Sequence, residues 1–174
     1  MKPLMANYEI AEIEDILLDL ERHAPLDILE WGSGGSTVYF PEFLSLTGIP
    51  FTWLSLEYNR RWYTHVTETV AGMEADLLGP VSVQLFPVDN DRSKQMHTNM
   101  DEYVAYPASL GRKWDFILVD GRKRRRCLLE AVNLLKPHGV VLLHDAEREY
   151  YHCAFSAYQN GHFTARRLWK GYAN

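Results

Sequence analysis

Short apolar runs alternate with amphipathic stretches along this chain, and the alternation limits its fold more than any other feature. Runs typical of buried strands lie at 26–30, 51–57, 81–89, 114–120 and 138–145, with a sixth at 162–170. Helical periodicity fills the intervals, and at 9–23 it gives one apolar stripe of Ile10, Ile13, Leu17 and Leu20. Strands that alternate with helices predict βαβ units. We therefore predict a doubly wound, mostly parallel α/β sheet of about six strands, with helices on both faces.

The segments between these runs are predicted to form the covering helices. We expect one helix from Ser36, a second ending at about Leu78, and others at 122–136 and 147–159. Pro41 predicts a kink or a delayed start in the first of them. The polar segment 90–111 has no clear period, and long loops in compact domains are often functional. We expect this segment to act as a mobile lid carrying Met96, His97, Met100 and Tyr103.

The bulk composition is that of one globular domain, residues 1–174. Hydrophobic residues make up 47% of the chain and charged residues 24%, and no apolar run is long enough to cross a bilayer. Acids interrupt the apolar pattern near the N-terminus, which is unlike a secretory signal. Cys127 and Cys153 lack metal-binding spacing and predict free thiols in a reducing, cytoplasmic setting.

Acids stand at the ends of the first five predicted strands. They are Glu30, Glu57, Asp89, Asp120 and Asp145, the last preceded by His144. In open α/β sheets, ligands bind outside the carboxyl ends of the strands. The sequence therefore predicts a binding site at this edge of the sheet.

The segment after the first strand reads G-S-G-G-S-T, residues 32–37, and predicts a tight turn into a helix capped by Ser36 or Thr37. A nicotinamide or flavin fingerprint reads G-x-G-x-x-G and binds a pyrophosphate at the helix N-terminus. Thr37 replaces the last glycine here, and the carboxylate of Glu30 would repel a pyrophosphate but suit an ammonium group. Glu57 ends the second strand, where an acid can bind ribose hydroxyls. The implied ligand has a ribose and an amino group but no pyrophosphate.

LDILEWGSGGST (26–37) resembles the first motif of class I S-adenosylmethionine (SAM)-dependent methyltransferases, in which an acid is followed by any one residue and then by G-x-G. LSLEY (54–58) and LLKPHGVVLLHD (134–145) are also similar to segments of that family. The resemblance implies a Rossmann-like fold with Glu30 near the methionine amino group. It implies Glu57 on the ribose, Tyr58 against adenine and Asp89 near the adenine edge. The methionyl and ribose part would be lined by Gly32, Ser33, Gly34 and Gly35, followed by Ser36 and Thr37.

The sheet of that family usually has seven strands and is closed by an antiparallel hairpin. Residues 162–170 supply one further strand, so we expect a shortened hairpin with the seventh strand absent or donated by a partner. An open edge strand is a template for pairing, and symmetric dimers are the commonest solution. We therefore predict a homo-oligomer.

The ends of the fourth and fifth strands would bring Asp120, His144 and Asp145 together. This arrangement resembles metal-dependent O-methyltransferases, which place acids after these strands around a divalent cation. Here histidine stands with Asp145 in place of the usual Asp–Asp or Asp–Asn pair. Asp120 and Asp145 are therefore candidate metal ligands, and His144 is a candidate metal-free base. Alternatively, the two acids only cap helices.

Five bases in a row occupy positions 122–126. Removing them from the net charge of −5 leaves −10, which argues against nucleic acid as a partner. Extending the apolar stripe of the following helix backwards reaches Arg124, so we expect Arg124 to point inward over the strand ends. Arg124, and Arg122 in the preceding turn, are candidates to bind an acidic substrate group. A solvated basic patch is the alternative.

Three functions fit this sequence. The first is a SAM-dependent methyltransferase that methylates an oxygen of a small acidic or hydroxylated acceptor. The second is a nucleotide-dependent oxidoreductase on a similar sheet, and the third is a non-catalytic SAM-binding or partner subunit.

Overall fold

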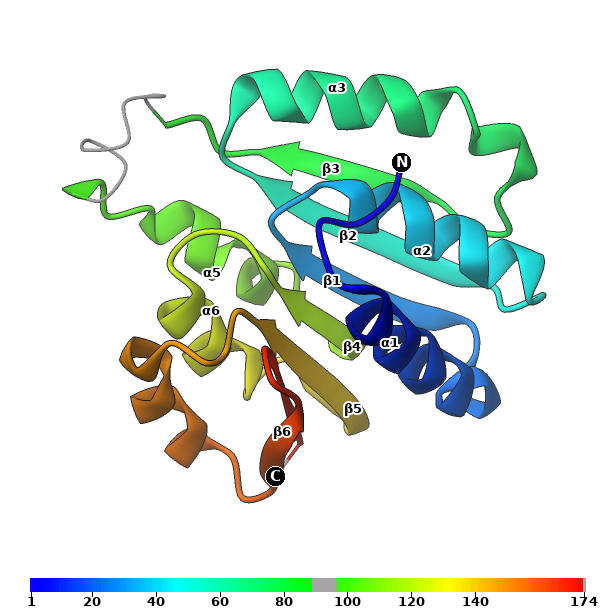
Figure 1. Ribbon diagram of the computed structural model, residues 1–174. Helices are drawn as coiled ribbons and strands as arrows, with labels where there is room; N and C mark the ends of the chain where they lie inside the picture. Colours follow the sequence, from blue (N-terminus) through cyan, green and yellow to red (C-terminus); the bar gives the residue numbers. More distant parts are fainter. Residues whose placement is uncertain (89–96, 174) are drawn as a thin grey trace.

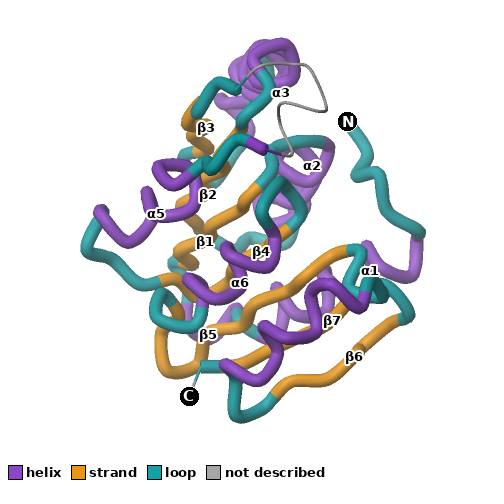
Figure 2. Tube along the Cα trace, turned by 90° about the vertical axis from the view of Figure 1, so that its left-hand side faces the viewer, coloured by secondary structure: helices purple, strands orange, loops and turns teal. Residues whose placement is uncertain are grey.

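The computed structural model describes residues 1–88 and 97–173, and Asp89 and Met96 lie outside this part. The chain folds around one seven-stranded sheet in the order β3-β2-β1-β4-β5-β7-β6 (Figures 1 and 2). The first five strands are β1 (Leu26–Trp31), β2 (Phe51–Glu57), β3 (Val81–Leu85), β4 (Trp114–Val119) and β5 (Leu135–His144). They pair in parallel, and β1 lies between β2 and β4. The predicted doubly wound α/β fold is confirmed.

Helices cover both faces of the sheet because alternate strand residues face opposite layers. One layer holds α1 (Asn7–Asp19), α2 (Gly35–Leu46) and α3 (Arg60–Ala71), and the other holds α5 (Asp101–Ser109), α6 (Arg124–Ala131) and the 3₁₀ helix η3 (Glu149–Ala157) (Figure 1). Ile28 packs in the first layer and its neighbour Leu29 in the second. Two shorter 3₁₀ turns are η1 (Glu21–His23) and η2 (Glu74–Asp76). Pro41 lies inside α2.

Two segments differ from what the sequence predicted. The helix predicted at 122–136 ends at Ala131, and β5 already begins at Leu135. The segment expected to act as a lid holds α5 in its described part, where Met100 and Tyr103 are buried. The carbonyl of Tyr103 accepts a hydrogen bond from the indole of Trp31 at 3.1 Å. Apolar packing against the sheet therefore fixes these two side chains, in contrast to the predicted mobility.

The sheet has seven strands where we predicted about six, and its C-terminal hairpin is complete rather than shortened. The stretch after η3 forms two antiparallel strands, β6 (Gly161–Ala165) and β7 (Leu168–Tyr172), and β7 pairs with β5. Their turn contains Arg166 and Arg167 in place of the glycine, asparagine or aspartate that usually marks a tight hairpin. The carbonyl of Arg167 accepts from the Ala146 amide at 3.0 Å, which holds the turn from outside the hairpin.

The same chain thus supplies the seventh strand, which we expected to be absent or donated by a partner. A missing seventh strand is therefore no longer a reason to expect self-association, which stays a prediction. In the described part of the chain, no helix combines the length and the apolar character needed to cross a membrane.

Candidate functional site

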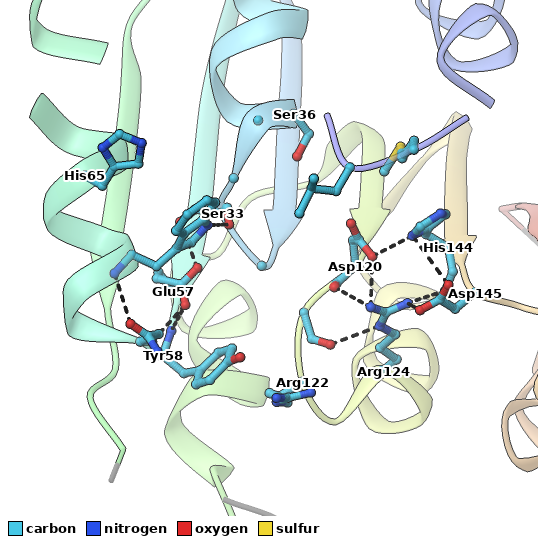
Figure 3. A pocket seen from close by; sticks show the side chains of 18 of the residues that line it. Ser33, Ser36, Glu57, Tyr58, His65, Asp120, Arg122, Arg124, His144 and Asp145 are labelled. Atoms are coloured by element: carbon cyan, nitrogen blue, oxygen red, sulfur yellow. Dashed lines mark hydrogen bonds and ion pairs between the residues drawn. The ribbon is translucent and has the colours of Figure 1, made fainter. Parts of the chain in front are cut away.

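A cavity of about 940 Å³ opens at the carboxyl edge of the sheet, where we predicted a site (Figure 3). The turns after β1, β2, β4 and β5 form its walls, together with the N-terminal segment and the hairpin turn. The predicted residues that line it are Gly32, Ser33, Gly34, Gly35, Ser36, Glu57, Tyr58, Asp120, Arg122, Arg124, His144 and Asp145. Residues that we had not assigned to the site include Leu4, Met5, Arg61, Trp62, His65 and Arg167.

Glycine is required at two positions of the turn after β1. Gly32 has a φ of 102°, and a Cβ there would lie 2.5 Å from the Cα of Gly121 in the turn after β4. At Gly35, a Cβ would collide with the backbone of Lys2 and Pro3. The glycines therefore let three chain segments meet at the wall of the cavity.

Glu30 does not line the cavity. Its side chain lies on the same face as Ile28, is fully buried beneath the start of α2, and accepts four hydrogen bonds. Thr37 donates at 2.7 Å and the indole of Trp53 at 3.1 Å, and the hydroxyls of Ser36 and Ser55 complete the set. Burial raises the pKa of Glu30 to about 7, although these donors act in the opposite direction. The structure thus differs from the expected ligand contact: Glu30 and Thr37 hold the turn from behind.

Glu57 has the orientation that Glu30 lacks. Its carboxylate lies at the cavity wall and accepts from the backbone amides of Tyr58 at 2.9 Å and Asn59 at 2.7 Å. The hydroxyl of Ser33 donates to its other oxygen at 2.8 Å. Burial raises the pKa of Glu57 against these hydrogen bonds. The residue is only 2% exposed, so a polar ligand here would meet a fixed, nearly dry carboxylate.

Trp62 is a site residue that we did not predict. It lies in the first turn of α3, whose cap Asn59 accepts from the Trp62 amide at 2.9 Å. Its indole N–H donates to the carbonyl of Ser33 at 2.6 Å, and the ring lies next to Gly34. On the same wall, the guanidinium of Arg122 stands 5.2 Å from the ring centre of Tyr58. Its position in the sequence could have indicated this role, because Trp62 lies only five residues after Glu57, at the start of the helix that follows β2.

Arg124 points inward, as its place on the helical stripe predicted, and its hydrogen-bonding capacity is used within the protein. Nη2 contacts the Asp120 carboxylate at 2.9 Å and the Asp120 carbonyl at 2.7 Å. Nη1 contacts the Asp145 carboxylate at 3.1 Å and the His144 carbonyl at 2.5 Å, while Nε donates to the Gly121 carbonyl at 3.0 Å. A guanidinium has five N–H donors. We had considered Arg124 as a ligand for an acidic substrate group, but the geometry shows it joining the ends of β4 and β5.

Asp145 has a φ of 57° and accepts from three arginines. Arg124 and Arg148, the latter at 2.8 Å, contact one carboxylate oxygen, and Arg167 from the hairpin turn contacts the other. Burial alone would raise the pKa of Asp145, but the charges of Arg124 and its other basic neighbours keep it below its usual value. Both oxygens of Asp145 are thus held by the protein.

His144 is buried between two acids. Its Nδ1 lies 2.8 Å from Asp120 Oδ1, and its Nε2 lies 3.6 Å from Glu9 Oε2. Burial lowers the pKa of His144, but the bond to Asp120 outweighs this effect and the pKa is raised overall. Glu9 was not predicted as a site residue. It lies four residues before Ile13, so extending the apolar stripe of α1 backwards, as we did for Arg124, would have found it.

The donor set does not fit a divalent cation. Asp120 and Asp145 do lie close together, as expected, but the guanidinium of Arg124 stands between their carboxylates. The described residues also contain no group of three or more His, Cys, Asp or Glu side chains that could hold a metal ion. The structure therefore gives no support to these acids as metal ligands.

Comparison with known proteins places the fold. No protein-family model matches the chain, and a search of curated proteins finds no match. Among solved structures, a methyltransferase-like protein from Silicibacter pomeroyi matches 99% of this chain and 89% of its own, with a TM-score of 0.69 and 22% identity. An O-methyltransferase from Streptomyces achromogenes, involved in tomaymycin synthesis and solved with SAM, matches 94% of this chain and 80% of its own, with a TM-score of 0.60 and 12% identity. The chain shares the Rossmann-like fold of SAM-dependent methyltransferases.

The buried carboxyl of Glu30 should make stability pH-dependent. Its pKa rises from 4.5 to about 7 on folding, so the folded state binds more protons between these values and stability falls as pH rises through them. Relative to Glu30→Gln, the wild type should lose about 3 kcal/mol of unfolding free energy between pH 4.5 and 7. Urea unfolding across this range measures the difference, with the exposed Glu42→Gln as control. Parallel pH profiles for the wild type and Glu30→Gln would contradict the assignment.

Proposed function

We propose that this protein is a SAM-dependent methyltransferase that methylates an oxygen of a small acceptor. The observation that carries the proposal is the fixed carboxylate of Glu57 beside a glycine-rich turn in a large cavity. Glu57 Oε2 accepts the Ser33 hydroxyl at the cavity wall, where a ligand hydroxyl can approach the same carboxylate. The shared fold agrees with a SAM site at this edge.

The residues on this side of the cavity fit the ligand that the sequence implied. Backbone at Gly32, Gly34 and Gly35 reaches the cavity without side chains in between. The indole of Trp62 and the ring of Tyr58 add flat apolar surfaces suited to the uncharged parts of a nucleoside. Asp89, expected at the adenine edge, lies outside the described residues and stays a prediction.

SAM, when bound, supplies an activated methyl group, so the chain must mainly orient an acceptor and accept its proton. Asp120 is suited to this step because 24% of its side chain is exposed, against 5% for His144. We assign the proton from the acceptor hydroxyl to a carboxylate oxygen of Asp120. His144 Nδ1 contacts Asp120 Oδ1 at 2.8 Å and orients the carboxylate as a positioning residue.

We infer the acceptor class from the other side chains that line the cavity. Because Arg124 is used within the protein, an acidic group on the acceptor would bind to Arg122 or Arg61, which also line the cavity. Leu4 and Met5 add apolar surface to the same cavity. We propose a small hydroxylated or acidic acceptor on this basis. We also propose a cytoplasmic homo-oligomer, with both cysteines as free thiols.

Replacing Glu57 should weaken SAM binding more than it weakens the fold. We expect Glu57→Ala to lower the affinity for S-adenosylhomocysteine by about 1–3 kcal/mol, because buried donors and the ligand hydroxyl lose their acceptor. Isothermal titration calorimetry measures this, with the exposed Glu68→Ala on α3 as control and NAD as a competing ligand class. Equal affinity in Glu57→Ala and wild type would remove the ribose assignment. Binding of NAD in preference to S-adenosylhomocysteine would favour the oxidoreductase.

Removing the proton acceptor should stop methyl transfer without disturbing ligand binding. With labelled SAM and a panel of small phenols and carboxylic acids, Asp120→Asn should lower kcat by about 10²–10⁴-fold. His144→Gln should lower it less, and both variants should bind S-adenosylhomocysteine like the wild type. Asp101→Asn, an exposed acid on α5, is the matched control. Wild-type turnover in Asp120→Asn would contradict the assigned role. If the wild type binds S-adenosylhomocysteine but transfers no methyl group to any acceptor, a non-catalytic SAM-binding subunit would be favoured.

A further inference from the structure

The oxygen atoms at the ends of β4 and β5 converge on one side chain. Two carboxylates, Asp120 and Asp145, and three backbone carbonyls, of Asp120, Gly121 and His144, point at the guanidinium of Arg124 at 2.5–3.1 Å. Carboxylate and carbonyl oxygens are the ligands that hard divalent cations prefer. We infer that the guanidinium of Arg124 takes the place of a divalent cation on the acceptor side of the site, which therefore works without metal.

The side chain of Arg124 is held firmly in this position. It leaves the first residue of α6, directly after Lys123, whose φ of 53° turns the chain into the helix. Only 13% of the side chain is exposed. Because each N–H group has an acceptor, a cation could reach these oxygens only by breaking several charge-assisted hydrogen bonds in a partly dry setting.

Basic groups already lie close to the acids of the cluster. Asp120 pairs with Arg124, and Asp145 pairs with Arg124, Arg148 and Arg167, the last of which also contacts Glu147. Arg148 and Arg167 contact one carboxylate oxygen of Asp145 each. A divalent cation added here would face three guanidinium groups and His144. Its binding would be opposed by Coulomb repulsion at short range.

The arrangement has a consequence for the proposed reaction. A metal would activate the acceptor hydroxyl by lowering its pKa. With Arg124 in that place, the O–H proton would pass to a protein group while the oxygen bonds to the methyl carbon and the methyl C–S bond of SAM breaks, with its electron pair left on sulfur. Arg124 and His144 both contact Asp120, so they orient the carboxylate that we assign to this step. Arg124 is thus a positioning residue. The inference rests on the proposed function only in this consequence, because metal binding can be measured without an acceptor.

The test is metal binding by the full chain after chelator treatment. We expect millimolar MgCl₂ or MnCl₂ to leave the melting temperature of the wild type unchanged, and electron paramagnetic resonance to find Mn²⁺ free in solution. The Arg124→Ala substitution removes the guanidinium that two carboxylates and three carbonyls contact. This variant should melt lower and gain several degrees with Mn²⁺, as expected for a ligand that binds only the folded state. Arg126→Ala, on the same helix but paired with the exposed Asp101, should behave like the wild type.

Stoichiometric Mn²⁺ binding by the wild type that is lost in Asp120→Asn would overturn the inference. So would a folded Arg124→Ala variant that gains no Mn²⁺ binding. If Arg124→Ala does not fold, Arg124→Lys replaces it: one ammonium cannot satisfy five acceptors, so this variant should melt lower than the wild type, and an unchanged melting temperature would count against the inference. S-adenosylhomocysteine affinity in chelator is measured in parallel. Its loss in the wild type would contradict the proposed function, whereas metal binding alone contradicts only this inference.

Discussion

The site depends most on the hydrogen bonds that the buried carboxyl group of Glu30 accepts. This group has no access to water, and its four donors come from β2 and from the first turn of α2. Glu30 therefore ties β1, β2 and α2 together directly behind the glycine-rich turn. A buried charge without donors would be very costly, so each hydroxyl in this group matters for the turn as well as for Glu30. The cavity-facing carboxylate of Glu57 and the indole of Trp62 are positioned against this same turn.

The other half of the cavity is organised by charge. An acid directly follows each of β4 and β5, and parallel pairing of the two strands brings these acids to one edge of the sheet. The fold neutralises them with arginines from three places: the start of α6, the segment after β5 and the hairpin turn. The arginine at the hairpin turn links the end of the sheet to the site. The need to neutralise Asp145 therefore explains why an arginine stands in this hairpin turn.

Much of this arrangement could be predicted from the sequence. Apolar runs marked the parallel strands, and the acids at their ends marked the edge that carries the cavity. Helical periodicity placed Arg124 inside the site. The direction of Glu30 was harder to predict, because it depends on Ser36, Thr37 and Ser55, which only the folded chain brings together. The complete hairpin was missed because Arg166 and Arg167 carry no turn signal, and Arg167 is held by tertiary contacts with Asp145 and Ala146.

The central claim is that the cavity beside Glu57 and the glycine-rich turn binds SAM. Nuclear magnetic resonance of the five tryptophan indole N–H groups tests its location directly. Trp62 donates to Ser33 at the cavity wall, whereas the indoles of Trp53 and Trp31 donate to buried groups away from it. Titration with S-adenosylhomocysteine should shift the Trp62 signal most. A saturating shift confined to other tryptophans, or no shift at ligand concentrations that saturate binding, would contradict the account.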